Sequence, residues 1–216
     1  MPATAEQKRF AAKVLRRLAK AYPEAKCSLD FESPLELLVA TILSAQCTDQ
    51  RVNLVTKDLF AKYKEAADYA RTELSEIEED IRSTGFFRNK AKNIQQCCRR
   101  LLDEYDGQVP QDIDHLVTLP GIGRKTANVV LGTGFGVASG VVVDTHVGRI
   151  SRRLGLTEQK NAEKAEEDLM AAFPRKEWIS LSHRMIHHGR AICMARKPKC
   201  EECSLSDICP RVGVDD

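Results

Sequence analysis

The chain has 216 residues, of which 43% are hydrophobic and 30% are charged, as in an ordinary soluble globular protein of one compact domain or two small ones. No apolar run approaches the roughly 20 residues of a membrane span, and residues 1–6 contain no hydrophobic signal core. We therefore expect a cytoplasmic protein with reduced thiols and no membrane partner. A formal net charge of only +2 gives no sign by itself of a nucleic-acid partner.

The distribution of charge is more informative than its total. Between Leu119 and Arg153 there are five basic residues and one acid, whereas Glu65 to Thr84 contains seven acids and two bases. A positive and a negative face would orient a bound polyanion. The alternative is an ordinary solvated surface with mixed charges, which this count favours equally.

Capping residues followed by apolar residues at helical spacing mark the helices of the first half of the chain. Thr4 with Gln7 forms a capping box for a helix that ends before Pro23. The same signals predict helices that start at Ser33, at Thr48 or Asp49, and at Ser75, and one over 90–105 that Gly107 ends.

The second half continues in the same way. We expect a short helix after Asp112 and longer helices over 124–131, from Asp144 to Arg153, from Asn161, and over 177–192. Val141–Val143 is the only strand-like run, and because it has no evident partner we interpret it as buried extended chain. The predicted fold class is all-α, with about ten helices.

A proline and two glycines separate the helix after Asp112 from the helix over 124–131. Pro120 lacks an N–H, and Gly121 and Gly123 each cost about 1 kcal/mol inside a helix, so the unit is helix, tight turn, helix. Exposed backbone N–H groups at a helix N-terminus form an anion site that suits a phosphate. Lys125 lies in the first helical turn, where the helix dipole disfavours its ammonium form, and a neutral amine can form a Schiff base. The alternative is a plain turn followed by a solvated lysine.

Four of the eight cysteines fall within 17 residues near the C-terminus, with the spacing C-x6-C-x2-C-x5-C. In a reduced compartment, four such thiols can bind zinc or a [4Fe–4S] cluster. A disulfide framework is a weaker third option. These four residues are Cys193, Cys200, Cys203 and Cys209, while Cys27, Cys47, Cys97 and Cys98 are expected to be core or surface thiols.

The segment Leu119-Pro-Gly-Ile-Gly-Arg-Lys-Thr-Ala127, together with Val143-Asp-Thr-His146, resembles the helix-hairpin-helix and aspartate signature of base-excision DNA glycosylases. The lysine at position 125 makes it similar to the endonuclease III branch. The cysteine spacing resembles the iron–sulfur loop of the same enzymes, and this resemblance implies a [4Fe–4S] cluster with a structural role.

The resemblance covers about residues 10–209 and implies two helical lobes. One is a helical barrel domain over 27–135 that contains the hairpin, and the other is an iron–sulfur cluster domain formed by 1–26 and 136–216. The cleft between the lobes would hold the damaged nucleotide. The segment 132–143 departs from the family pattern in being one residue longer and rich in glycine.

The resemblance also implies roles for individual residues. Lys125 would be the nucleophile at the sugar C1′, and Asp144 would be its catalytic partner rather than only a helix cap. Gln46 would fill the gap left by a flipped base, and Phe86 would wedge between bases. The alternatives are an ordinary helix-end glutamine and a loop aromatic packed on the core. The expected phosphate contacts are Gly121, Ile122, Gly123, Arg124, Lys197 and Lys199.

The function implied is that of a bifunctional glycosylase and abasic-site lyase that removes oxidised pyrimidines from duplex DNA. Its partner would be double-stranded DNA with damaged bases or abasic sites, and we expect a monomer associated with a bacterial nucleoid. One alternative is a glycosylase without lyase activity, related to adenine-mismatch enzymes. Another is a non-catalytic DNA-binding module or an iron–sulfur electron carrier.

Overall fold

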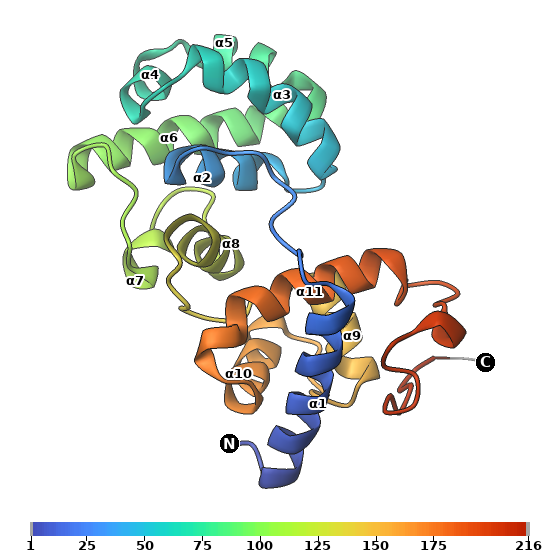
Figure 1. Cartoon of the computed structure of the whole chain (residues 1–216). Coiled ribbons are helices and arrows are strands. Elements are labelled where there is room, and N and C mark those ends of the chain that lie inside the picture. Colours follow the sequence, from blue (N-terminus) through green and yellow to red (C-terminus); the bar gives the residue numbers. More distant parts are fainter. Residues whose placement is uncertain (1, 215–216) are drawn as a thin grey trace. The chain divides into compact units, whose positions relative to one another are not determined.

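The computed structural model describes residues 2–214, and helices are the only regular structure in them (Figure 1). Predicted N-caps start six of the described α-helices. A side-chain oxygen there accepts one of the backbone N–H groups that a first helical turn leaves without a partner. The caps that do so are Thr4, Ser33, Thr48, Asp112, Asp144 and Asn161.

The chain divides into two units, each with its own apolar core. The central unit is Cys27–Val137, and the terminal unit combines Met1–Lys26 with Ala138–Asp216. No helix within residues 2–214 is both long and apolar enough to cross a membrane.

The central unit is built around a helix that is buried on all sides. This helix is α2, Pro34–Leu43, and every residue from Leu37 to Leu43 is buried. A helix that is apolar all round needs neighbours on all sides, and α2 packs against α3, α6, α8 and η2. The elements of this unit are α2, α3 (Asp49–Lys62), α4 (Ala66–Arg71), α5 (Leu74–Asp80), η1 (Arg82–Thr84), α6 (Phe87–Tyr105), α7 (Ile113–Leu116), α8 (Arg124–Val129) and η2 (Val130–Gly134).

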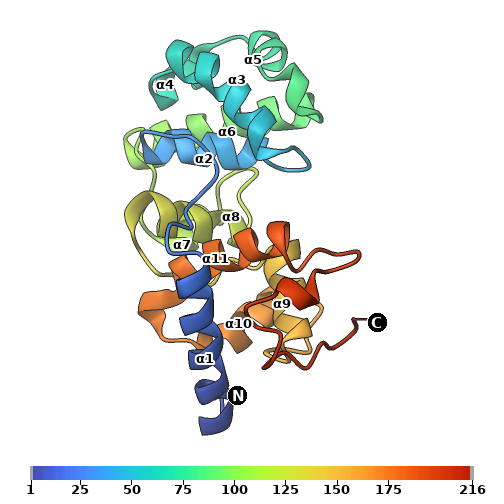
Figure 2. The same cartoon turned by 45° about the vertical axis from the view of Figure 1, so that its right-hand side comes forward.

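The terminal unit joins the two ends of the chain. Its first helix, α1, packs against α10 and α11, and α9 packs against the same two helices (Figures 1 and 2). The buried residues of α1, Val14 and Leu18 among them, share one core with Leu181 and Met185 of α11. The elements are α1 (Ala5–Ala21), α9 (Thr145–Arg153), α10 (Ala162–Ala172), η3 (Arg175–Glu177), α11 (Trp178–Ala191) and η4 (Cys200–Glu202).

Several element boundaries differ from the sequence prediction. Helix α4 was not predicted, because its start depends on Glu65 and Asp68, which cap the helix reciprocally without an S/T/N signal. Helix α5 begins at Leu74 rather than after Ser75, and α6 begins at Phe87, three residues before the predicted start at Lys90.

The predicted helix over 124–131 ends as a regular α-helix at Val129 and continues as the π-helical turn η2. A π-helical turn holds more residues than an α-helical turn of the same helix. It lies at the start of the glycine-rich segment 132–143. Val141–Val143 is extended chain with two of its three residues buried, as predicted.

Candidate functional site

The hairpin turn between α7 and α8 requires one of its two glycines. Gly121 has φ of +79°, and a Cβ there would lie 2.9 Å from Cβ of Asn93 on α6. Gly123 is the N-cap of α8, with φ of −92° and open space around it. Ile122 lies between the two glycines and is buried, so it anchors the turn in the core. Gly121 and Gly123 are both exposed to solvent. The turn predicted from the sequence is therefore present, with Gly121 as its constrained position.

Lys125 lies one residue into α8 and is exposed at a pocket of the central unit. Three separate turns supply the lining of this pocket: the end of α2, the start of α6 and the hairpin. The structure therefore brings Lys125 together with Gln46, Phe86 and Gly121, which the sequence places up to 79 residues apart.

Gln46 and Phe86 have left-handed backbones, with φ of 53° and 48°. Such conformations are costly for residues other than glycine and gather at functional sites. Of the five described non-glycine residues with positive φ, these two line the pocket. The Phe86 side chain is 63% exposed, which excludes the alternative that it is an aromatic packed on the core.

A buried lysine lies beneath these two turns. Lys90 is 4% exposed, and its Nζ donates to Leu43 O and to Thr84 O, each at 2.8 Å. Burial lowers the pKa of Lys90. Sequence reasoning missed this residue, because a lysine on a helix is usually solvated and no local signal shows that a distant carbonyl lies within its reach.

Asp144 belongs to the terminal unit, where it is the N-cap of α9. Its Oδ1 accepts a hydrogen bond from Val147 N at 2.8 Å, and the side chain is half-buried. The capping interpretation is therefore confirmed. The capping hydrogen bond uses Oδ1 of Asp144, and a carboxylate has a second oxygen that can accept further hydrogen bonds.

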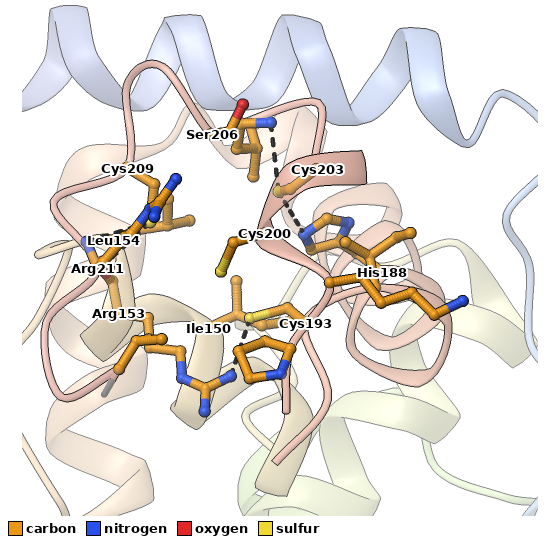
Figure 3. A pocket seen from close by; sticks show the side chains of 15 residues that line it. Ile150, Arg153, Leu154, His188, Cys193, Cys200, Cys203, Ser206, Cys209 and Arg211 are labelled. Carbon is orange, nitrogen blue, oxygen red and sulfur yellow. Dashed lines mark hydrogen bonds between the residues drawn. The ribbon is translucent and has the colours of Figure 1, made fainter. Parts of the chain in front are cut away.

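The four C-terminal cysteines line one pocket of the terminal unit (Figure 3). Its wall includes apolar side chains from α9 and from the loop, such as Ile150, Leu154 and Leu205. None of the eight cysteines forms a disulfide. The disulfide framework is therefore excluded.

Polar hydrogens point at the sulfur atoms of this pocket. Cys203 Sγ accepts from Leu205 N, and Cys209 Sγ accepts from Arg211 N, each at 3.4 Å. Arg153 Nη1 lies 3.3 Å from Cys193 Sγ. Donors around sulfur stabilise thiolates and are what an iron–sulfur site needs from its surroundings.

Electrostatics adds a second reason for a bound cation here. Burial raises the pKa of Cys203 and Cys209, and the neighbouring cysteines raise both further. The thiolate forms of Cys203 and Cys209 are therefore favoured when positive charge compensates them. Within residues 2–214 no group of three or more His, Cys, Asp or Glu side chains is placed to hold a metal ion. A [4Fe–4S] cluster inserts its own iron and sulfide atoms between its four ligands, so it needs them further apart than one ion does. The donor set fits such a cluster.

Two arginines of α9 hold the loop that carries the cysteines, so part of the basic charge counted between Leu119 and Arg153 faces backbone carbonyls rather than solvent. Arg149 donates to Cys193 O through Nε at 3.0 Å and to Gly189 O at 3.1 Å. Arg153 is 8% exposed and donates to Met194 O at 2.7 Å and Ala195 O at 3.1 Å. Arg152 donates to Gln159 O at 3.3 Å. The sequence count could not distinguish these arginines from surface arginines, because it contains no information on which carbonyls lie within reach.

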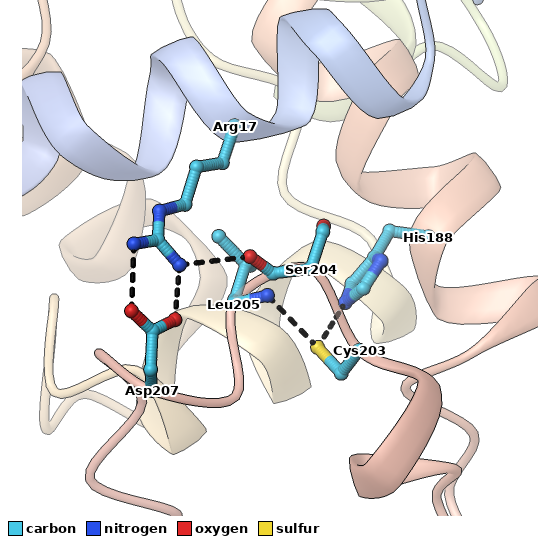
Figure 4. Close-up of polar contacts among 6 residues, drawn as sticks. All are labelled: Arg17, His188, Cys203, Ser204, Leu205 and Asp207. Carbon is cyan, nitrogen blue, oxygen red and sulfur yellow. Dashed lines mark hydrogen bonds and ion pairs between the residues drawn. The ribbon is translucent and has the colours of Figure 1, made fainter.

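Helix α1 also reaches the cysteine loop (Figure 4). Arg17 pairs with both carboxylate oxygens of Asp207 and donates to Ser204 O at 3.0 Å. Tyr22 Oη lies 3.0 Å from Nδ1 of the buried His188, whose Nε2 lies 3.5 Å from Cys203 Sγ. The first helix of the chain thus supports its last loop.

The two lysines of the cysteine loop remain at the surface. Lys197 is exposed and has φ of 49°. Lys199 is exposed and its Nζ lies 3.9 Å from a carboxylate oxygen of Glu202. Both can therefore meet a phosphate, as the sequence interpretation requires.

Comparison with family models gives two matches. Residues 39–175 match the model of the HhH-GPD superfamily base excision DNA repair proteins. Residues 193–209 match the iron–sulfur binding domain of endonuclease III, a span that begins and ends on the first and last of the four cysteines.

Individual proteins agree with these models. The endonuclease III of Synechocystis is 56% identical over 206 residues, which is 95% of this chain and 94% of the relative. A solved non-covalent endonuclease III–DNA complex is similar with a TM-score of 0.90 and 49% identity, covering 94% of this chain and 95% of the other. A trapped endonuclease III–DNA covalent intermediate, described as an estranged-adenine complex, has a TM-score of 0.90 and 48% identity, covering 94% and 96%.

Proposed function

The chain belongs to the HhH-GPD superfamily of base excision DNA repair proteins and, within it, to the endonuclease III family, and from this premise we propose which of its residues perform the reaction. The enzyme is a bifunctional DNA glycosylase and abasic-site lyase that binds DNA and carries a [4Fe–4S] cluster. The observation that carries the residue assignments is the pocket that gathers Lys125, Gln46 and Phe86 from three turns.

Lys125 is the nucleophile. Its Nζ forms a bond to C1′ of the damaged nucleotide while the glycosidic bond breaks and the base leaves with a proton. The nitrogen lone pair then opens the sugar ring by breaking the C1′–O4′ bond, and O4′ takes a proton from solvent and becomes a hydroxyl. The resulting iminium acidifies the C2′ proton. Removal of that proton expels the 3′ phosphate by β-elimination, and hydrolysis then frees the lysine. A solvent-exposed amine beside two turns that can enter a duplex suits this sequence of steps.

Asp144 is the catalytic partner of Lys125. Its carboxylate stabilises the positive charge that develops on the sugar or accepts the lysine proton. The hydrogen bond to Val147 N fixes the orientation of the side chain while it acts. The two residues belong to different units, and the proposal requires both to face the same sugar.

Gln46 and Phe86 enter the duplex, the first into the space of the extruded nucleotide and the second between neighbouring bases. The hairpin residues Gly121, Ile122, Gly123 and Arg124 bind phosphates, and Lys197 and Lys199 add a second phosphate contact. The preferred substrates are oxidised pyrimidines. The enzyme acts as a monomer on the chromosomal DNA of the nucleoid.

Cys193, Cys200, Cys203 and Cys209 are the ligands of the cluster. When bound, the cluster supplies four iron–thiolate bonds that fix the loop bearing Lys197 and Lys199. Arg149 and Arg153 donate hydrogen bonds to the backbone of the same loop.

Borohydride trapping on a thymine-glycol duplex tests these assignments. The wild-type enzyme is expected to give a covalent protein–DNA adduct, and the Lys125→Ala variant is expected to give none. Lys92→Ala is the matched control, because Lys92 is an exposed lysine of the same unit outside the pocket. A Lys125→Ala variant that still traps would refute the nucleophile assignment. Base release by wild-type enzyme without strand cleavage would instead support a glycosylase without lyase activity.

Sedimentation and substrate competition test the remaining assignments. The free enzyme is expected to sediment as a monomer, and its complex with a duplex is expected to have the mass of one protein and one duplex. Two protein chains on one damaged site would contradict the monomer. An oxidised pyrimidine is expected to be released ahead of an alkylated purine when both are offered in equal amounts.

A further inference from the structure

We propose that Lys90 is a positioning residue that couples the turn carrying Gln46 to the turn carrying Phe86, so that both side chains enter a duplex as one unit. This inference rests on the proposed function, because it takes the roles of Gln46 and Phe86 in DNA from there. It assigns to Lys90 no contact with DNA and no chemical step.

The geometry of Lys90 links the two turns directly. Its Nζ donates to Leu43 O, three residues before Gln46, and to Thr84 O, two residues before Phe86, both at 2.8 Å. Its backbone N–H donates to Phe86 O at 3.2 Å, the first hydrogen bond of α6. One residue therefore binds the end of α2 and both sides of the Phe86 turn.

The carbonyl of Leu43 needs a donor of this kind. It lies in the last turn of α2, where carbonyls have no partner within the helix and the helix dipole is negative. The N–H of Cys47, which a continued helix would have directed to Leu43 O, bonds instead to Ser44 O at 3.2 Å. An ammonium group satisfies this carbonyl and suits the dipole, and it leaves the chain free to turn at Gln46.

Stability alone is a poor explanation for a lysine at this position. Burial of an ammonium group is costly, and apolar residues of similar volume often fill such places equally well. Buried polar groups can instead select one arrangement among several. Here the arrangement includes two left-handed residues, Gln46 and Phe86, on either side of the pocket that contains Lys125.

The chain offers a matched control for the loss of a buried hydrogen bond. Gln95, also on α6, is 6% exposed, and its Nε2 donates to Thr72 O at 2.7 Å. Thr72 follows α4 and is not part of the pocket. Lys90→Met and Gln95→Met thus each remove a buried side-chain donor to a backbone carbonyl on the same helix, but only the first affects the two turns.

The experiment measures binding to a duplex with a tetrahydrofuran abasic analogue opposite 2-aminopurine, and to the undamaged duplex. Fluorescence of 2-aminopurine reports whether the opposite base is unstacked. We expect Lys90→Met to weaken binding to the tetrahydrofuran duplex by about tenfold, the size of coupling found within one hydrogen-bond network. Binding to undamaged duplex is expected to change by less than about twofold, because phosphate contacts dominate it.

A double-mutant cycle separates coupling from general destabilisation. In a Gln46→Ala, Phe86→Ala background, Lys90→Met is expected to have no further effect on binding or fluorescence. An equal loss in that background, or an equal loss for Gln95→Met, would overturn the coupling. If Lys90→Met does not fold, Lys90→Gln is tested in the same cycle, since a shorter amide donor keeps polarity at the site.

The same data distinguish this inference from the proposed function. If Gln46→Ala with Phe86→Ala binds the tetrahydrofuran duplex as the wild type does, the roles of those residues are wrong and the coupling fails with them. If that variant binds weakly and Lys90→Met binds normally, only the coupling is wrong.

Discussion

Replacement of Arg153 by methionine tests how the cysteine loop is held. Methionine keeps much of the length of the side chain and removes its guanidinium. In the structure this group donates to Met194 O at 2.7 Å and to Ala195 O at 3.1 Å, and it lies 3.3 Å from Cys193 Sγ. All three acceptors belong to the residues that follow α11, where the cysteine loop begins.

The expected cost follows from these contacts. A hydrogen bond from a charged donor contributes about 1.5–3 kcal/mol, and a buried acceptor left without a donor adds its own desolvation cost. Water can reach part of the exposed loop and replace some of these contacts, so we expect a total loss of about 2–4 kcal/mol in the free energy of unfolding. Because the loop carries the cluster ligands, the same change is expected to lower the iron content.

Arg152→Met is the control, because it removes the same charge one residue earlier on α9. Arg152 makes one longer hydrogen bond, to Gln159 O at 3.3 Å, and a loss of about 1 kcal/mol is expected. Guanidinium titration followed by circular dichroism and by the visible absorbance of the cluster measures both quantities. Equal iron content and equal stability in the two variants would refute the role of Arg153, and so would an Arg153→Met variant indistinguishable from wild type.

Three further predictions concern other parts of the molecule. Gly121→Ala is expected to weaken binding to damaged and undamaged duplexes alike by about tenfold, because Gly121 has positive φ and an added Cβ would overlap α6. Gly123→Ala is the control and should bind within about twofold of wild type, because the space around Gly123 is open. A larger loss of binding for Gly123→Ala than for Gly121→Ala would contradict the turn geometry. Arg17→Ala should lose cluster absorbance faster in air than wild type, because α1 then no longer holds the loop through Asp207; an unchanged rate of loss would show that the pair is not needed. Burial raises the pKa of Cys97 to about 12, which leaves roughly one Cys97 thiol in ten thousand ionised at pH 8. Iodoacetamide should therefore label the half-buried Cys47 before it labels Cys97. Since the folded pKa of Cys97 lies above its ordinary value of 9.0, its contribution to stability is present below that pH and is lost as the pH rises towards 12; prior labelling of Cys97 in native protein would refute the burial argument.

The family membership explains why motifs were so informative here. The hairpin and the cysteine loop are short segments whose chemistry is contained in a few consecutive residues. Each family model match covers one of them, over 39–175 and over 193–209. The iron–sulfur cofactor, the all-α fold and the enzyme class predicted from the sequence are confirmed, whereas the roles of Lys125 and Asp144 and the preferred lesion stay predictions.

The amino-acid sequence by itself determined the features that depend on neighbouring residues. Helix starts at Thr4, Ser33, Asp144 and Asn161 were predicted correctly, because an N-cap bonds to N–H groups two or three residues away. The start of α4 was missed because its reciprocal cap uses Glu65 and Asp68 rather than the common cap residues.

Only the tertiary structure decided what the long basic side chains do. Lys90, Arg149 and Arg153 each reach carbonyls that lie 6 to 47 residues away in the chain. A long flexible side chain can turn to solvent or to any carbonyl within several ångströms, and local sequence does not select among these outcomes. The buried lysine and the arginines of α9 therefore became visible only once helices far apart in sequence were packed side by side.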